Sequence, residues 1–196
     1  MTVTIHLVRH GTHAEVGRVL SGRSEIALDT RGCGEVQALV DVVSGLPIRS
    51  LHTSPRRRAR ETIAPLAARL GLDVHITPAL DEVDFGGFTG RSFAELDGDP
   101  AWQKWNAERN EARCPGGETM AEAAVRAAAY LRGIPSDQSP ALCVSHCDVI
   151  RGVVAQALGL SFDRIFQFDC DPASITTLEL SGAGARIVSL NQRARR

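Results

Sequence analysis

Residues 2–11 read TVTIHLVRHG, and this stretch decides how the rest of the chain is interpreted. Thr2 to Val8 is rich in β-branched and apolar residues, and Val3, Ile5 and Leu7 recur with the period of two that is typical of a strand. Arg9-His10-Gly11 then follows as a charged turn. The pattern predicts a strand that delivers an arginine and a histidine to its carboxyl end.

The residues after this strand alternate between helical and extended patterns. Helical patterns cover 30–44, 55–70, about 101–111, 119–132 and 149–158, and extended patterns cover 49–53, 73–77, 141–145, 174–180 and 186–190. The alternation predicts an α/β fold, a three-layer α/β/α sandwich whose central sheet is mostly parallel with an antiparallel edge. We expect a single domain over 1–196, with a loop-rich and partly helical insertion at about 81–117.

Composition excludes several classes of partner. Lys and Arg number 22 against 23 Asp and Glu, so no overall basic field attracts nucleic acid or an anionic membrane. No apolar run approaches the length of a membrane span, and the N-terminus does not resemble a secretory leader, which predicts a cytoplasmic protein. Five cysteines without a CxxC pair favour reduced thiols. The sequence makes no prediction of the oligomeric state.

Polar residues follow three of the predicted strands. Arg9 and His10 follow the first, Ser54 and nearby arginines follow the second, and His146 follows the strand at 141–145. The carboxyl ends of parallel strands meet at one edge of a sheet, where ligands bind in open α/β folds. Guanidinium and imidazole groups without a carboxylate cluster suit an anion, so we expect a phosphate site there.

These residues also lie in a recognisable order. The motifs are Arg9-His10-Gly11, Ser54-Pro55-x-x-Arg58-Ala59-x-x-Thr62, Glu82-x-x-Phe85-Gly86, and Ser145-His146 followed by Ile150-Arg151. In this order the chain resembles the histidine phosphatase superfamily, the phosphoglycerate-mutase-like group. The resemblance spans nearly the whole chain.

The resemblance implies hydrolysis of phosphate monoesters through a phosphohistidine on His10, without a metal or another cofactor. It implies that Arg9, Arg58 and His146 bind the phosphoryl oxygens and that Glu82 donates the proton to the leaving group. We expect Gly22 and Cys147 to contribute to the binding of a small phosphorylated substrate.

The residues alone leave alternatives open for two roles. Asp81 and Asp84 compete with Glu82 for the proton-donor role, and Arg57 competes with Arg58 as the phosphate-binding arginine. We interpret Arg56, Arg57 and Arg60 as a solvated basic helix face.

A metal site at His6, His10 and His13 is disfavoured, because no carboxylate joins them and the neighbouring arginines repel a cation.

Two other functions also fit the sequence. One is a cofactor-dependent phosphoglycerate mutase, although the stretch between Glu82 and His146 carries few basic residues. The other is a non-catalytic protein that binds a phosphorylated ligand. Cys147 and Asp148 stand where the family usually has two glycines, and Val16 stands where many members have asparagine. We favour an inert packing role for Cys147 over a reactive one.

Overall fold

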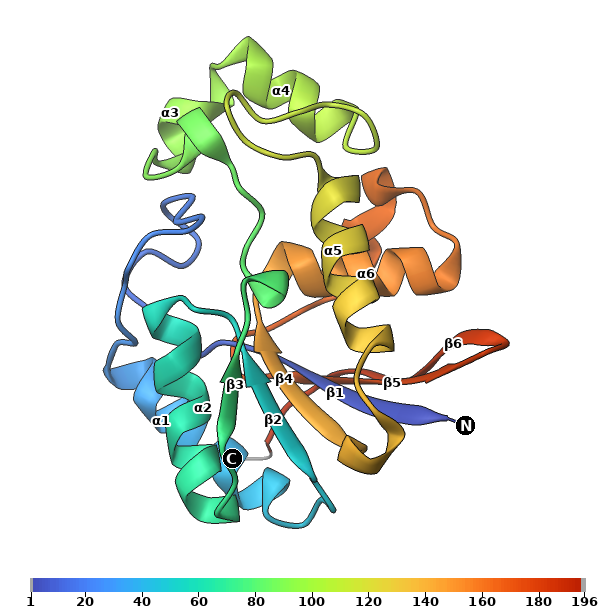
Figure 1. The fold of residues 1–196 in the computed structure, drawn as a ribbon. Helices are drawn as coiled ribbons and strands as arrows, with labels where there is room; N and C mark the ends of the chain where they lie inside the picture. Colours follow the sequence, from blue (N-terminus) through green and yellow to red (C-terminus); the bar gives the residue numbers. More distant parts are fainter. Residues whose placement is uncertain (1, 195–196) are drawn as a thin grey trace.

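The computed structural model describes residues 2–194, and its core is a six-stranded sheet (Figure 1). The strands are β1 (Val3–Arg9), β2 (Ser50–Thr53), β3 (Val74–Ile76), β4 (Ala141–Ser145), β5 (Ile175–Ser181) and β6 (Gly184–Gln192), in the spatial order β3-β2-β4-β1-β5-β6. β3, β2, β4 and β1 run parallel to one another. β5 runs antiparallel to β1, and β6 runs antiparallel to β5. This mixed sheet confirms the predicted fold class.

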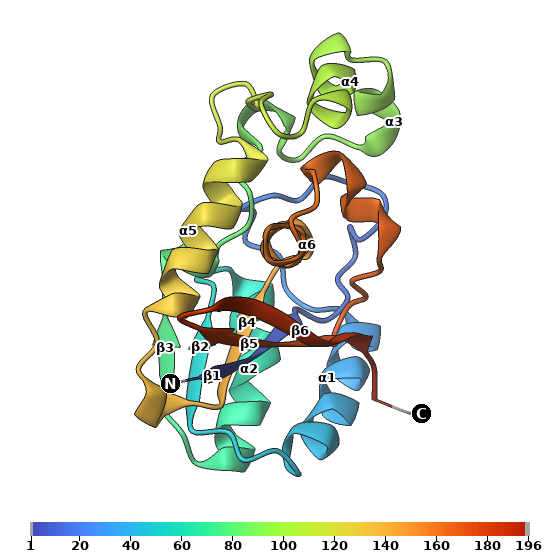
Figure 2. The same cartoon turned by 90° about the vertical axis from the view of Figure 1, so that its right-hand side faces the viewer.

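Helices cover both faces of the sheet (Figure 2). On one face, α1 (Thr30–Val43) and α2 (Arg57–Leu70) pack Leu39, Ile63 and Leu66 against side chains of β1, β2 and β4. On the other face, α5 (Met120–Arg132) and α6 (Cys147–Leu158) bury their apolar sides against β1, β4 and β5. Alternate residues of β1 therefore enter two different cores, which is the period of two expected of a doubly covered strand.

A helical cap rises above the carboxyl ends of the parallel strands (Figure 1). After β3 the chain forms the short 3₁₀ helices η1 (Pro78–Leu80) and η2 (Gly86–Phe88), then α3 (Phe93–Asp97) and α4 (Pro100–Ala107). Phe88 and Trp105 are buried, and Trp102 stacks on Trp105 with ring centroids 5.3 Å apart. These aromatic residues therefore form the packed interior of the cap. The 3₁₀ helices η3 (Ser136–Gln138) and η4 (Phe162–Gln167) complete the fold.

Strand register places the predicted site residues side by side. Arg9 pairs with Ser145, and Thr53 pairs with Val144. Beyond these pairs the His10 amide donates to the Ser145 carbonyl at 3.1 Å, and the Ser54 amide donates to the Val144 carbonyl at 3.0 Å. The residues that follow β1, β2 and β4 therefore meet at one edge of the sheet.

Among the differences from the sequence prediction, two are helix starts near the site and one is a helix that was not predicted. Helix α2 begins at Arg57 instead of Pro55, because the Ser54 hydroxyl is engaged by His146 and does not cap the helix. Helix α6 begins at Cys147 instead of Val149, directly after the extended His146. Helix α3 was not predicted; Ser92 and Glu95 close it with a capping box. Within residues 2–194 no helix is both long and apolar enough to cross a bilayer.

Candidate active site

A cavity of about 250 Å³ opens where the carboxyl ends of the strands meet the cap. Its walls include most of the residues that the sequence singled out: Arg9, His10, Gly22, Arg58, Glu82 and Cys147. Most of the predicted site is therefore one continuous surface.

His10 is held in one tautomer. Its Nδ1 lies 2.8 Å from the Gly11 carbonyl oxygen, to which it donates, and its Nε2 accepts from Arg58 Nε at 3.2 Å. Burial, followed by the charges of Arg58 and Arg9, holds the pKa of His10 well below its usual value. The ring is therefore neutral, with the Nε2 lone pair directed toward the guanidinium groups.

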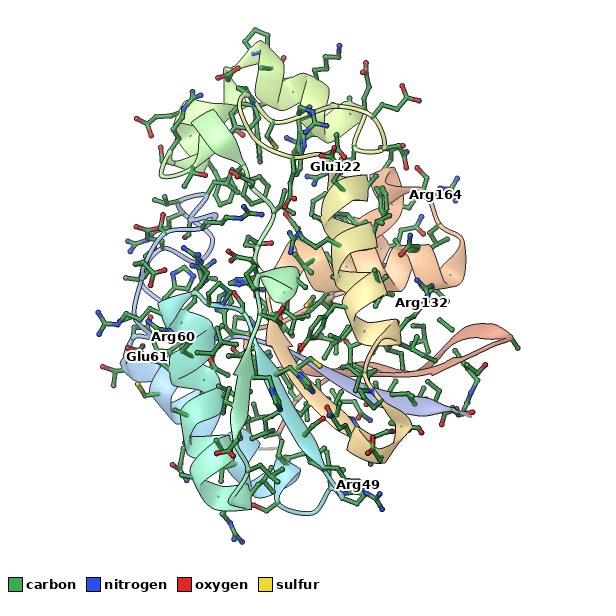
Figure 3. All side chains as sticks on the ribbon, viewed as in Figure 1. Arg49, Arg60, Glu61, Glu122, Arg132 and Arg164 are labelled. Atoms are coloured by element: carbon green, nitrogen blue, oxygen red, sulfur yellow. The ribbon has the colours of Figure 1, made fainter. Side chains whose placement is uncertain are left out.

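Arg58 occupies the centre of the site. Its Nη2 donates to the Gly22 carbonyl at 2.6 Å and also contacts His146 Nδ1 at 3.0 Å. The residue is only 1% exposed, whereas the Arg57 side chain is 54% exposed and pairs with Glu61 at the helix surface. The geometry therefore favours Arg58 over Arg57. Arg60 is also exposed, and Figure 3 places it on the outer side of α2.

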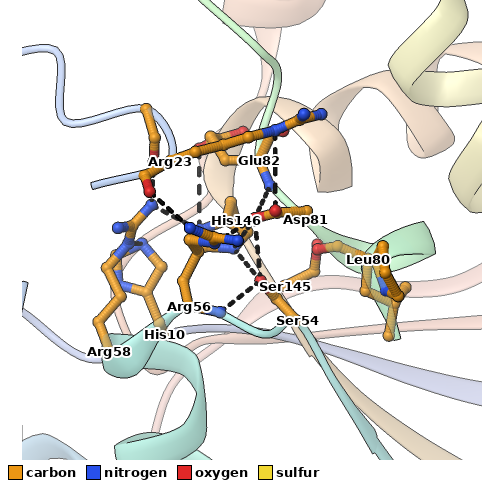
Figure 4. Close-up of polar contacts among 12 residues, drawn as sticks. His10, Arg23, Ser54, Arg56, Arg58, Leu80, Asp81, Glu82, Ser145 and His146 are labelled. Carbon is orange, nitrogen blue, oxygen red and sulfur yellow. Dashed lines mark hydrogen bonds and ion pairs between the residues drawn. The ribbon is translucent and has the colours of Figure 1, made fainter. Parts of the chain in front are cut away.

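His146 lies behind Arg58 and not on the cavity wall. It is fully buried, and its ring centroid is 5.1 Å from that of His10. Its Nε2 lies 2.7 Å from the Ser54 hydroxyl, which in turn donates to Asp81 Oδ1 at 3.2 Å (Figure 4). Burial, and then Arg58, hold the pKa of His146 well below its usual value. The chain from His146 through Ser54 to Asp81 could stabilise a positive imidazole once an anion binds.

Arg56 corrects one sequence interpretation. Its Nε lies 3.1 Å from Asp81 Oδ1 and its Nη1 lies 3.0 Å from Glu25 Oε1, so it is not part of a solvated helix face. The basic run could not reveal this, because the turn at Ser54-Pro55 rotates Arg56 toward the site before the helix begins. Arg56 and Arg23 both form ion pairs with Asp81 (Figure 4).

The carboxyl groups of Asp81 and Asp84 are already engaged. Asp81 Oδ1 accepts from the Glu82 amide at 2.9 Å and pairs with Arg56, and its Oδ2 lies 3.7 Å from Arg23. Asp84 accepts from Arg23 at 3.2 Å and from the Gly86 amide at 3.0 Å. Neither carboxyl group lines the cavity, so neither is placed to donate a proton to a substrate there.

Glu82 has the opposite environment. It lines the cavity, its Oε1 accepts from the Val83 amide at 3.0 Å, and its Oε2 lies 4.0 Å from His146 Nδ1. Burial, and next the charge of Asp148, raise the pKa of Glu82 to about 8, although Arg58 opposes the shift. A carboxylic acid that keeps its proton near neutral pH is suited to general acid catalysis.

Arg9, Gly22 and Cys147 complete the wall around His10. Arg9 Nη1 donates to the Cys170 carbonyl at 2.7 Å, which holds the guanidinium at the cavity. Gly22 has φ +49°, and a Cβ there would lie 2.8 Å from the Thr89 hydroxyl oxygen, so only glycine fits without a shift. Cys147 begins α6 on the same wall.

The histidines do not form a metal site. His6 Nδ1 lies 3.0 Å from the Thr177 hydroxyl, whereas the rings of His10 and His13 lie 5.2 Å apart at the cavity. Among residues 2–194 no three His, Cys, Asp or Glu side chains are arranged to hold a metal ion.

Two kinds of residue line the rest of the cavity. Apolar residues are Val16, Val19, Leu20, Phe93 and Trp102, and polar or charged residues are Asn106, Arg109, Asp148 and Arg151, with Phe166 against both arginines. Arg109 and Phe166 were not among the predicted site residues. Arg109 lies in the turn after α4 and Phe166 in the short 3₁₀ helix η4, where the sequence offers no periodicity that would indicate their direction.

Comparison with known proteins agrees with this geometry. Residues 5–193 match the family described as histidine phosphatase superfamily (branch 1). The chain belongs to the histidine phosphatase superfamily. Phosphatases that resemble this histidine phosphatase act on phosphate monoesters, and the superfamily works through a phosphohistidine intermediate.

Three relatives illustrate the range of the superfamily. The chain is 25% identical over 193 residues to the adenosylcobalamin/alpha-ribazole phosphatase of Escherichia coli, covering 96% of this chain and 95% of the relative. It is 32% identical to the "Probable phosphoglycerate mutase GpmB" of Proteus mirabilis, covering 80% and 75%. The fold matches that of a mycobacterial glucosyl-3-phosphoglycerate phosphatase with a TM-score of 0.84 at 24% identity, covering 98% of this chain and all of the other.

Proposed function

We propose that this histidine phosphatase hydrolyses a small phosphate monoester in two displacements at His10. His10 Nε2 attacks phosphorus, the ester oxygen leaves, and Glu82 supplies the proton that makes the leaving group an alcohol. Glu82 then takes a proton from water as the water oxygen attacks the phosphohistidine, and inorganic phosphate is released. Arg9, Arg58 and His146 stabilise the charge on the three non-bridging oxygens in both steps.

The observation that carries this proposal is the state of the His10 ring. Its Nδ1 proton is fixed by the Gly11 carbonyl, and its Nε2 faces Arg58 at the cavity. A neutral imidazole held in this orientation is a nucleophile, and an arginine beside it can shift its donors to an incoming phosphate. Arg58 then leaves the Nε2 lone pair free to attack.

Trapping of the intermediate tests the proposal. Enzyme mixed with ³²P-labelled substrate and quenched in base, where phosphohistidine survives, should carry label on a peptide that contains His10. His10→Ala should carry none and should lose phosphate release by at least about 10³-fold. His13→Ala is the matched control, because His13 lines the same cavity, and it should still become labelled. Label on another residue would contradict the mechanism.

The products separate phosphatase from mutase. The similarity to GpmB makes transfer of the phosphoryl group to a second hydroxyl the alternative, and the phosphohistidine is common to both reactions. A phosphatase releases inorganic phosphate in step with substrate loss. A mutase instead interconverts 2- and 3-phosphoglycerate after priming with a bisphosphate. Phosphate binding without either reaction would indicate the non-catalytic protein.

Two arginines of the cavity lining, Arg109 and Arg151, support the proposal that the leaving group of the substrate carries a carboxylate. Arg109 is 3% exposed and lies between the rings of Trp105 and Phe166, at 4.1 and 4.8 Å from their centroids. The Arg151 guanidinium carbon also lies over the Phe166 ring, 4.9 Å from its centroid. Arg109, Arg151 and Asp148 all line the cavity, so this group of lining residues carries an excess of positive charge. A carboxylate on the substrate would offset that excess.

Replacement of one arginine tests this preference. Arg151→Met keeps the apolar stem and should lower kcat/KM for phosphoserine or 3-phosphoglycerate by about tenfold or more, because a charge-assisted hydrogen bond is worth about 1.5–3 kcal/mol. The value for glycerol 3-phosphate, which lacks a carboxylate, should change little. Arg164→Met is the control, because Arg164 is exposed on the outer side of η4 (Figure 3). Equal losses for both substrates would contradict the preference.

A further inference from the structure

Two cysteines meet at the wall of the cavity. Cys147 is the first residue of α6 and borders the cavity, and Cys170 lies buried in the segment between η4 and β5. The Cys147 sulfur lies 3.8 Å from the Cys170 carbonyl oxygen, and each thiol shifts the pKa of the other. The fold therefore brings together two sulfur atoms that are far apart in sequence.

The two thiols differ in chemical character. The hydrogen bond from the Cys170 thiol and the charges of Arg9 and Arg151 lower the pKa of Cys147 to about 7, against the opposing effect of burial. The same pairing, together with burial, raises the pKa of Cys170 well above its usual value. Near neutral pH a large share of Cys147 is therefore thiolate, while Cys170 keeps its proton.

We propose that Cys147 and Cys170 form a reversible oxidative modification site that switches off the active site beside it. The oxidant is a hydroperoxide. The Cys147 thiolate attacks one peroxide oxygen, the O–O bond breaks, and sulfenic acid and an alcohol or water result. The Cys170 sulfur then attacks the Cys147 sulfur, its proton leaves with the sulfenic oxygen as water, and a disulfide forms. Two electrons pass from the two sulfurs to the peroxide.

The position of the pair links its oxidation to activity, a consequence that depends on the function proposed above. Arg9, which faces the phosphoryl group in that proposal, donates to the Cys170 carbonyl at 2.7 Å. Closing a disulfide pulls Cys147 and Cys170 together and moves this carbonyl, so Arg9 loses its support. Cys147 also follows His146 directly, so a shift at the start of α6 reaches the phosphate site.

The other cysteines lack these properties. Cys114 and Cys143 are fully buried, and burial raises the pKa of Cys114 to about 12 and that of Cys143 still further above its usual value. Cys33 is exposed on α1 and does not border the cavity. Cys33 is therefore the natural control for a thiol that is accessible but remote.

Peptide mapping after oxidation tests the site. Purified full-length protein is treated with hydrogen peroxide, free thiols are alkylated, and the non-reduced digest is analysed by mass spectrometry. We expect a peptide pair linked through Cys147 and Cys170, in proportion to a loss of most of the phosphatase activity. Dithiothreitol should reverse both changes, and inorganic phosphate or vanadate should slow them. Cys33→Ser should behave as the wild type does.

Two variants and one independent measurement sharpen the test. Cys147→Ser should lose the peroxide sensitivity, with activity normalised to the untreated variant. Cys170→Ser should instead accumulate sulfenic acid on Cys147 that dimedone labels. Absence of the linked peptide, or unchanged sensitivity of Cys147→Ser, would overturn the proposal. A linked peptide without loss of activity would overturn the switch. If the untreated protein released no phosphate, the proposed function would fail, and the linked peptide and the stabilisation by phosphate before and after oxidation would still test the site.

Discussion

The charge of Asp148 acts on Glu82 through the cavity that both line. Because burial and this neighbouring charge raise the pKa of Glu82 to about 8, the carboxyl group stays protonated up to that pH and loses its proton above it. Hydrolysis of alkyl phosphates, which need a proton on the leaving group, should therefore fall as the pH rises through this value.

Asp148→Asn should move the fall in alkyl phosphate hydrolysis to lower pH. The like charge that favours protonated Glu82 is removed, so the carboxyl group ionises earlier. Profiles of kcat against pH for an alkyl phosphate, compared with those of the exposed-site variant Asp169→Asn, measure the shift. If the decrease in kcat stays at the same pH, or moves to higher pH, a group other than Glu82 controls it.

Glu82 also links stability to pH. Its folded-state pKa of about 8 lies above the usual 4.5, so the folded protein keeps a proton that the unfolded chain has already lost between these values. Stability therefore decreases as the pH rises across this interval. Glu82→Gln should remove the penalty and raise the melting temperature relative to the wild type by about 2–4 °C or more at about pH 8.5, but not at about pH 5. An equal difference at both pH values would contradict the shifted pKa.

Individual residues also show where sequence reasoning stops. His10 could be placed because it directly follows a strand whose period of two is clear. Arg56 could not, since its direction depends on whether the helix starts at Pro55 or at Arg57, and four basic residues within five positions look alike in sequence. Glu82 was separated from Asp81 and Asp84 only by family resemblance; the structure adds the physical reason, which is that both aspartates are held by arginines and amides.

Helix α1 supports the loop that carries His10 through one close backbone contact. A Cβ on Gly32 would lie 2.0 Å from the Thr12 carbonyl oxygen, whereas a Cβ on Gly34, two residues along the same helix, would meet nothing within 4 Å. The first turn of α1 therefore lies in close contact with the backbone just after His10.

Alanine at these two glycines should have opposite effects. Gly32→Ala should destabilise the fold by about 3 kcal/mol and lower activity, because backbone must move to relieve the contact. Gly34→Ala should stabilise by about 0.5–1 kcal/mol, because alanine restricts the unfolded chain and favours the helix. Urea unfolding and phosphatase assays of both variants check this. Destabilisation of the same size in both would contradict the contact.

Elements with a clear hydrophobic period were predictable, and those without one were not. The strand at 141–145 was located to the residue, because a buried apolar run lies between polar neighbours. Helix α3 was missed since its five residues are too few to establish a helical period. The start of α6 was placed two residues late because Cys147 and Asp148 are polar or small and do not extend the apolar pattern.

The whole molecule has a net charge of −1, yet its cavity is cationic. Four arginines line the cavity, with only Glu82 and Asp148 as acidic residues. The positive groups come from separate segments, and only the sheet order brings them together: Arg9 is the last residue of β1, and Arg58 lies in the first turn of α2 after β2. Composition excluded a general basic surface, and the motif order indicated a local one. The arrangement of the outer cavity could not be predicted, because it depends on how the cap packs.

This cavity should make stability depend on anions. Inorganic phosphate or vanadate should raise the melting temperature of the wild type, with a gain of about 2.7 kcal/mol at about 100 times the dissociation constant. Arg58→Met should abolish most of the gain, and Arg60→Met, which alters an exposed residue of the same helix, should retain it. Thermal unfolding with matched concentrations of sodium chloride separates specific binding from ionic strength. An equal gain in both variants would place the anion elsewhere.

Strand β1 lies between β4 and β5, and Ile5 pairs with both Ala141 and Leu178. During synthesis His10 is therefore made among the first residues, whereas the flanking strands follow only at residues 141–145 for β4 and 175–181 for β5. The sheet around β1 therefore cannot form while the first half of the chain is being made. Contacts so distant in sequence also slow folding. A chain that ends before Ile175 should be inactive and readily degraded by proteases, even though it contains His10, Arg58, Glu82 and His146.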